Sequence, residues 1–380
     1  MADFRRFIEY GQLRRHWFVV ISLSTIFILI SSQFNHELTL QHLYVNQIKI
    51  KPISDSVKVS KNIQKDGPIS YAVFCTTTPN GESYRSYDYA YNVPLTALAW
   101  ERIGFKSIVL IIGSRCEWEN DPTLSLILSR LEERSGIAIF VKTSLNYRST
   151  ISQMARIFVT NFKEFPGKES DYLITSDADL WPIRKEHFIP HSNMDIVLVH
   201  GECCGEFKMN NKFYSMYPMS NIGATVSIWR QLMNENHSIA YDSESILNYL
   251  QDVFGEISWS SDIVGRETWY MDQRLISIRI AEWMELHGQN SVYRVSDKGF
   301  SRADRASWAE VEKLSSEQFL SKFDSHLPRK GYLPKQQAKI KPLIDFMYGN
   351  NSLESKWIHK YNQEFLEKVN NWIEFNNLDY

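Results

Sequence analysis

The sequence has few cysteines, and none of them has the spacing of a zinc site. Its four cysteines are Cys75, Cys116, Cys203 and Cys204, without a Cys-x-x-Cys pair, so a structural zinc site is not expected. Cys75 lies in an apolar run, where a thiol is more often a small buried hydrophobic group than a ligand. In an oxidising compartment Cys116 could pair with Cys203 or Cys204, whereas adjacent cysteines rarely bond each other because that geometry is strained.

The chain also has little net charge. Its 42 Lys and Arg residues nearly balance 44 Asp and Glu residues, which leaves a formal charge of −2. The basic residues are scattered and form no concentrated patch, so no nucleic-acid partner is expected. No internal repeat or low-complexity tract is present, and 380 residues are enough for one large domain with appendages.

A long uncharged apolar run occurs near the N-terminus. Four arginines precede the segment Trp17–Ile30. We expect residues 1–16 to form a cytosolic tail, residues 17–32 a signal anchor and residues 33–68 a stem, because basic residues keep their end of a span cytosolic. The run is short for a span of about 20 residues, and a cleaved signal peptide is the alternative. The expected location is the Golgi or endoplasmic reticulum membrane, as a single-pass type II protein.

Strand and helix patterns alternate after the expected stem. Apolar runs predict strands at residues 71–78, 106–112, 137–141, 172–174 and 195–200. Helices are predicted at 91–102, from the N-cap Asp121 with Pro122, from a capping box Thr150–Gln153, and at 225–233 and 271–286. This order predicts a doubly wound α/β sheet over residues 69–335, with ligands at the carboxyl ends of its strands. Residues 336–380 are predicted to form a helical accessory region.

Two aspartates follow the fourth predicted strand. In an extended segment the side chains at i and i+2 share a face, so Asp177 and Asp179 can address one point beyond the strand end. Carboxylate oxygens suit hard cations such as Mg²⁺ or Mn²⁺, which keep positions free for substrate phosphates. An Asp-x-Asp triplet is also common in solvated turns.

The Asp177-Ala-Asp179 triplet resembles the D-x-D motif of nucleotide-sugar glycosyltransferases with the GT-A fold. That resemblance implies a mixed sheet with a Rossmann-like nucleotide-binding half and an acceptor half. It also implies metal-dependent transfer of a hexosyl group, with Mn²⁺ or Mg²⁺, from a nucleotide-diphosphate sugar. A UDP-sugar is the expected donor, and a glycan, glycoprotein or glycolipid is the expected acceptor.

Further site residues follow from the same resemblance. Residues 323–331 partly match a His-plus-Lys-Gly element, which makes His326 the expected third metal ligand and Lys330 a diphosphate contact. Arg156 occupies the position of a donor-binding basic residue in the helix before the D-x-D strand. The hydroxyls that would contact the base and ribose are those of Thr76, Thr77 and Thr78. Each of these residues also has an ordinary structural interpretation, as a surface or turn residue.

Asp272 is the expected catalytic carboxylate on the acceptor side. The segment Trp269–Gln273 resembles the Asp-Gln element of retaining GT-A enzymes, which together with His326 favours retention. In an inverting enzyme Asp272 would instead act as the general base, and an N-capping aspartate is the structural alternative. The loops 200–205 and 217–223 are expected acceptor contacts.

Two other functions fit parts of the pattern. A phosphatase of the haloacid dehalogenase type also uses Asp-x-Asp, but usually after its first strand. A glycosyltransferase-like protein that binds sugars or partners without turnover is the non-enzymatic alternative. Glycosylation sequons at Asn236 and Asn350 agree with a lumenal chain, although chance also supplies such triplets.

Overall fold

A computed structural model describes residues 67–79, 87–143, 148–190, 193–233, 242–255, 267–295 and 302–375. The predicted tail, anchor and nearly all of the stem lie outside these residues, and so does Asn236. Within the described ranges, no helix is both long and apolar enough to cross a membrane.

A seven-stranded mixed sheet forms the centre of the described fold, in the order β10-β6-β9-β4-β1-β2-β3. β1 is parallel to β2 and β4, whereas β9 is antiparallel to both β4 and β6. The bounds are β1 Ser70–Thr77, β2 Lys106–Ile112, β3 Ile137–Val141, β4 Tyr172–Thr175, β6 Ile196–Val199, β9 Ile222–Thr225 and β10 Val292–Val295. The strands predicted at 71–78, 106–112, 137–141, 172–174 and 195–200 are therefore confirmed, and the sheet is an α/β sheet of mixed direction.

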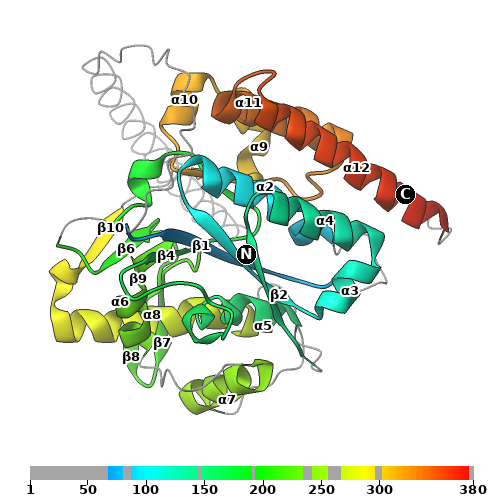
Figure 1. The fold of residues 1–380 in the computed structure, drawn as a ribbon. Coiled ribbons are helices and arrows are strands. Elements are labelled where there is room, and N and C mark those ends of the chain that lie inside the picture. The colour runs from blue at the N-terminus through cyan, green and yellow to red at the C-terminus, as the bar shows by residue number, and fades with distance from the viewer. Residues whose placement is uncertain are drawn as a thin grey trace, which may run out of the picture. The chain divides into compact units, whose positions relative to one another are not determined.

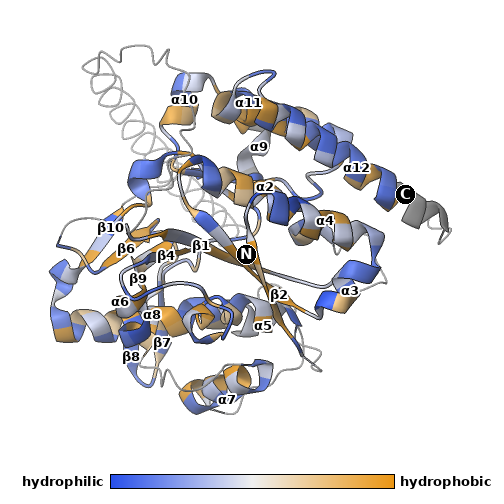
Figure 2. Ribbon diagram, viewed as in Figure 1, coloured by the Kyte–Doolittle hydropathy of each residue, from blue (hydrophilic) through white to orange (hydrophobic). Residues whose placement is uncertain are grey.

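Helices cover both faces of this sheet (Figure 1). One face carries α2 Tyr87–Arg102, α4 Pro122–Glu133, α11 Pro334–Tyr348 and α12 Leu353–Phe375. The other carries α5 Arg148–Ala155, α6 Val226–Met233, α7 Ser243–Phe254 and α8 Met271–His287. Because both faces are covered, the central strands are mainly apolar and carry their polar residues near their ends, and Figure 2 shows the apolar character of β1 and β2.

The helix starts agree only in part with the sequence signals. Asp121 caps α4 as predicted, because its Oδ1 accepts hydrogen bonds from the backbone N–H groups of Thr123 and Leu124 at 2.8 and 2.9 Å. The capping-box prediction at Thr150 is wrong, since α5 already includes Arg148 and Thr150 lies inside the helix. A Thr-x-x-Gln sequence inside a helix is identical to a capping box at a helix start, so the motif alone predicted the wrong first residue for this helix.

The C-terminal helices share a hydrophobic core with the sheet-covering helices. The Tyr361 ring stacks on the Tyr91 ring of α2 at 5.4 Å between centroids, and its hydroxyl donates to the Tyr91 carbonyl at 2.8 Å. Tyr91 in turn donates to Oδ1 of Asn362 at 2.8 Å. Among the described residues, the helices α11 and α12 therefore pack in the same core as α2 and α4.

A small second sheet, which the sequence did not indicate, positions the candidate site. It consists of β11 Arg302–Ala303, β12 Asp324–His326 and β5 Leu180–Pro182, with β12 antiparallel to β5. Leu180 pairs with His326 in this register, so the residues after β4 lie beside the end of β12. The remaining described elements, also not predicted, are α3 Arg115–Asn120, α9 Trp308–Val311, α10 Ser316–Leu320 and the hairpin β7 Glu206–Met209 with β8 Lys212–Ser215.

Candidate active site

Asp177 and His326 are in contact although 149 residues separate them. The β5–β12 pairing brings them together, and Nε2 of His326 lies 3.2 Å from Oδ2 of Asp177. The other ring nitrogen of His326, Nδ1, lies 3.5 Å from Oδ2 of Asp304. Asp179 is fixed by the same pairing, because its carbonyl accepts a hydrogen bond from the backbone N–H of Leu327 at 2.9 Å. We call Asp177, Asp179, Asp304 and His326 the acidic cluster.

Charges within the acidic cluster stabilise one another. Burial alone would raise the pKa of Asp177, but the Arg156 guanidinium and His326 more than offset it and hold that pKa well below its usual value. Burial would likewise lower the pKa of His326, yet its bonds to Asp177 and Asp304 raise it to about 9. At neutral pH, His326 is therefore a cation between two carboxylates.

Asp179 is buried, and one of its oxygens has no hydrogen bond. Its Oδ2 lies 2.8 Å from Nη2 of Arg305, and only 4 % of the residue is exposed. Its Oδ1 is buried and has no hydrogen-bond partner among the described residues. A buried carboxylate oxygen without a partner carries a large desolvation cost, which a bound cation would offset.

These residues include ligand types that bind divalent metal ions. Two carboxylates and an imidazole suit Mg²⁺ or Mn²⁺, and Oδ1 of Asp179 is an oxygen donor that no protein group uses. As the side chains stand, no group of three or more His, Cys, Asp or Glu residues in the described ranges is arranged around a common metal position. His326 and Arg305 occupy the oxygens that an ion would share, so metal binding would displace the proton of His326 and the Arg305 contact.

Arg156 and Asp272 form a buried brace behind Asp177. Nη1 of Arg156 donates to Oδ1 of Asp177 at 2.6 Å and to the Ser176 carbonyl at 2.9 Å, and Nη2 donates to Oδ2 of Asp272 at 2.7 Å. The side chains of Arg156 and Asp272 are 5 % and 2 % exposed. Burial raises the pKa of Asp272, against the opposing charge of Arg156. This geometry suits Arg156 to orienting Asp177.

Asp272 is not the N-cap of α8. The N-cap is Tyr270, and Asp272 is the second residue of the helix. Its Oδ1 accepts the backbone N–H of Gln273 at 2.7 Å, while its other oxygen holds Arg156. Both oxygens of Asp272 thus accept hydrogen bonds within the protein. This arrangement suits a carboxylate that orients Arg156 better than one that removes a proton from an acceptor.

A second buried ion-pair network lies just before His326 on β12. Asp324, which is fully buried, accepts two hydrogen bonds from Arg302, from Nε at 2.7 Å and from Nη2 at 2.9 Å. Its Oδ2 also lies 3.0 Å from Nε2 of His200 and 2.6 Å from Nδ2 of Asn221. Burial alone would raise the pKa of Asp324, but Arg302 and His200 hold it well below its usual value. The network joins the small sheet to His200, directly after β6, and to Asn221, directly before β9. Both residues belong to loops that were predicted to contact an acceptor.

The predicted nucleotide contacts lie at the end of β1, the strand beside β4. Thr76 is buried and Thr77 is half-buried. The Thr78 hydroxyl is held by the protein, because it accepts a hydrogen bond from Nε1 of Trp118 at 3.0 Å and donates to the Ile112 carbonyl at 3.3 Å. A Cβ on Gly113 would overlap that hydroxyl at 1.9 Å. The role of these residues in nucleotide binding remains a prediction.

Lys330 lies against the first turn of α2. Its backbone N–H donates a hydrogen bond to Oδ1 of Asp88 at 3.0 Å. The backbone of Lys330 is in the left-handed conformation, with φ of 53°. Burial raises the pKa of Asp88 from 3.8 to about 6, although the Lys330 N–H and the charges of Lys330 and Arg329 oppose it. Asp179 adds a repulsive charge, so Asp88 and Lys330 belong to the surroundings of the acidic cluster.

Replacing Asp88 by Asn is expected to stabilise the protein above pH 6. Folding raises the pKa of the Asp88 carboxyl from 3.8 to about 6. The protonated carboxyl therefore contributes fully to the stability of the folded state below pH 3.8, and this contribution is lost as the pH rises through 6. Asp88→Asn should therefore raise the free energy of unfolding by about 1–2 kcal/mol at pH 7.5, allowing for partial exposure, and change it little at pH 3.5. Urea denaturation at both pH values measures this, with the exposed Asp252→Asn as control. An equal effect at both pH values would contradict it.

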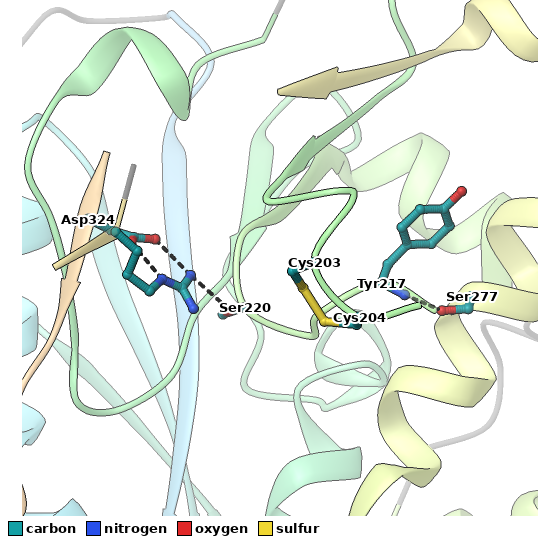
Figure 3. The surroundings of a disulfide bond; sticks show 7 residues. Cys203, Cys204, Tyr217, Ser220, Ser277 and Asp324 are labelled. Carbon is teal, nitrogen blue, oxygen red and sulfur yellow. Dashed lines mark hydrogen bonds and ion pairs between the residues drawn. A yellow bond between two sulfur atoms is a disulfide. The ribbon is translucent and has the colours of Figure 1, made fainter. Parts of the chain in front are cut away.

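Cys203 and Cys204 form a disulfide with each other, in the loop between β6 and β7 (Figure 3). The expectation that adjacent cysteines would not pair is therefore wrong, as is a bond from Cys116 to either of them. Cys116 is a free, exposed thiol on α3, and Cys75 is free on β1. Figure 3 also shows Asp324 and the hydrogen bond from the Tyr217 backbone N–H to the Ser277 hydroxyl, which is 2.9 Å long.

Several residues at the site carried no recognisable signal in the sequence. Arg305 contacts Asp179 and Asp304 contacts His326 from the segment after β11. Burial raises the pKa of Tyr89 to about 12, and the nearby charge of Asp179 adds to this increase. None of them belongs to a motif. The pairing of β11 with β12 brings their segment to the cluster, and that pairing was not predicted.

Comparisons with known proteins give only distant similarities. No model of a protein family matches the sequence, and no curated protein does. Among solved structures, the chain is similar to a glycosyltransferase involved in the glycosylation of the major capsid of PBCV-1, with 9 % identity, a TM-score of 0.33, and coverage of 73 % of this chain and 100 % of that one. It is also similar to 4-diphosphocytidyl-2C-methyl-D-erythritol synthase, with 11 % identity, a TM-score of 0.27, and coverage of 48 % and 85 %.

The same synthase from Anaerococcus prevotii gives 12 % identity, a TM-score of 0.29, and coverage of 61 % of this chain and 90 % of that one. All three TM-scores lie below 0.5. These similarities therefore carry no information about the substrate or the reaction of this chain.

Proposed function

We propose that this chain is a metal-dependent glycosyltransferase that uses a nucleotide-diphosphate sugar, with a UDP-sugar as the expected donor. The observation that carries the proposal is the contact between Asp177 and His326, together with a nearby Asp179 that has one oxygen buried and without a partner among the described residues. The site lies where the parallel strands β1 and β4 end, which is where ligands bind in open α/β sheets.

Asp177, Asp179 and His326 would hold the metal ion. A bound Mn²⁺ or Mg²⁺ supplies positive charge that stabilises the phosphate leaving group. The brace formed by Arg156 and Asp272 holds the Asp177 carboxylate in one orientation, and preorganisation of this kind avoids the cost of ordering the group during the reaction. The contact between the Lys330 N–H and Asp88 holds the Lys330 segment beside the same site.

The stereochemical course that fits these contacts is retention. Asp272 is buried and bonded to Arg156, so it supports the site as an orienting residue and does not face an acceptor hydroxyl as a base. The acceptor is proposed to be a glycan, glycoprotein or glycolipid, which would enter over the loops 200–205 and 217–223. We further propose that the protein is anchored in a membrane of the secretory pathway, an arrangement with which the exposed sequon at Asn350 agrees.

A thermal-shift screen tests this function. Purified protein is mixed with UDP, GDP or CMP and with the corresponding nucleotide sugars, each with Mn²⁺, with Mg²⁺ or with EDTA. One nucleotide series should raise the melting temperature only when a divalent ion is present, because the ion joins the carboxylates to the diphosphate. The surface variant Asp252→Asn should respond like the native protein.

The screen also separates the alternatives. No response to any nucleotide from a folded protein, or equal responses with metal and EDTA, would rule out the proposed function. A metal-dependent response without sugar transfer to a broad acceptor panel would favour the non-catalytic binding protein.

A further inference from the structure

Two arginines contact the D-x-D carboxylates, and only one of them is placed to exchange partners. Arg156 is 5 % exposed and is bonded to Asp177, Asp272 and the Ser176 carbonyl. Arg305 is 26 % exposed, and Nη2 of its side chain lies 2.8 Å from Oδ2 of the nearly buried Asp179. Moving Arg156 would leave the buried Asp272 without its cation and Asp177 with His326 alone, whereas Arg305 is more exposed and contacts one carboxylate.

The groups with the largest electrostatic effect on Arg305 are acidic or phenolic. Asp179, Tyr89, Asp177 and Asp304 all raise the pKa of Arg305, although burial opposes them, so the side chain stays cationic. Its 3-10 turn follows β11, which pairs with the strand that carries His326. The guanidinium therefore neutralises Asp179 through Oδ2, on the same carboxylate whose Oδ1 has no partner among the described residues and would meet a divalent ion.

From this geometry we infer that Arg305 is an exchangeable counter-ion: it neutralises Asp179 while no metal is bound, and binds the donor diphosphate after metal displaces it. This inference rests on the proposed function. A dication and a guanidinium repel each other, so both cannot share one small carboxylate site without a further anion. The diphosphate supplies that anion, and a planar guanidinium binds phosphate oxygens through paired hydrogen bonds. Arg305 thus weakens metal binding alone and strengthens binding of the nucleotide to the metal-loaded protein.

The variant Arg305→Gln should have opposite effects on these two ligands. Loss of the competing cation should tighten Mn²⁺ binding about fivefold or more, which is the lower range of coupling between two sites. Loss of the charged hydrogen bonds should weaken UDP binding at saturating Mn²⁺ about tenfold or more. Free Mn²⁺ is measured by electron paramagnetic resonance and UDP binding by calorimetry, both on the purified full-length protein.

Further variants separate exchange from a structural role. Arg305→Lys keeps the positive charge and should retain the native affinity for Mn²⁺. Arg305→Met removes the charge, should behave like Arg305→Gln, and replaces that variant in the test if Arg305→Gln does not fold. Arg115→Gln, which removes a surface arginine paired with Glu119, should change neither ligand's affinity.

Three outcomes are decisive. Tighter Mn²⁺ binding together with weaker UDP binding supports the inference. Weaker binding of both ligands, or no change in either, overturns it while leaving the proposed function in place. A native protein that binds neither Mn²⁺ nor UDP overturns the proposed function itself.

Discussion

Asp179→Asn is expected to reduce sugar transfer at least about 10³-fold, because removing a metal-coordinating charge costs several kcal/mol of transition-state stabilisation. The substitution keeps the size of the side chain but removes the negative charge from the buried oxygen that has no protein partner. Asp177→Asn should have a similar effect, since Asp177 is the carboxylate that Arg156 and His326 both hold. Transfer is measured as release of nucleoside diphosphate from the donor that the screen identifies.

The fold should tolerate the change at Asp179. Its Arg305 contact is partly exposed, so the melting temperature should change little compared with the loss of transfer. Asp252→Asn, at an exposed position on α7, should transfer sugar at the native rate. Native activity in Asp179→Asn would show that the D-x-D carboxylates do not take part in the reaction.

Asp324→Ala is expected to lower the free energy of unfolding by about 3–5 kcal/mol, the usual cost of breaking a buried ion pair from one side. Asp324 is fully buried and binds Arg302 through two hydrogen bonds. Its removal leaves Arg302, His200 and Asn221 without their shared acceptor. Because Asp324 holds β12 against the residue after β6 and the residue before β9, His326 should also lose its fixed position.

A surface ion pair provides the comparison. Glu119 pairs with Arg115 at 3.3 Å, and both side chains are about half exposed, at 54 % and 48 %. Glu119→Ala should therefore change the free energy of unfolding by less than about 1 kcal/mol. Equal urea midpoints for Asp324→Ala and the native protein would contradict the role assigned to the buried network.

The central part of the fold was predictable because its signals are local. The strands at 106–112 and 137–141 are continuous apolar runs, and the Asp121-Pro122 pair marks a helix start by its chemistry alone. The strand β9 was missed because Ile222–Thr225 contains a glycine and only four residues, which a pattern search assigns to a loop. Its place between β4 and β6 depends on pairing partners far along the chain.

The candidate site was predictable only as separate pieces. Strand periodicity predicts that Asp177 and Asp179 share a face, and a partial resemblance to a known motif predicts His326 as a ligand. Neither argument predicts the contact between Asp177 and His326. That contact results from the pairing of two three-residue strands, β5 and β12, which are too short to give a sequence pattern. Arg156 was predicted as a donor-binding residue and Asp272 as a catalytic carboxylate, and nothing in the sequence showed that they would bond to each other.

The central claim, that a divalent ion joins the acidic cluster to a nucleotide diphosphate, is tested most directly by calorimetric titration of the purified protein with UDP. Titrations are run with saturating Mn²⁺ and with EDTA. Binding should occur with Mn²⁺ and disappear with EDTA and in Asp179→Asn, and at a ligand concentration of about 100 Kd it should stabilise the fold by about 2.7 kcal/mol. Equal binding with Mn²⁺ and with EDTA, or equal binding by the native protein and Asp179→Asn, would contradict the claim.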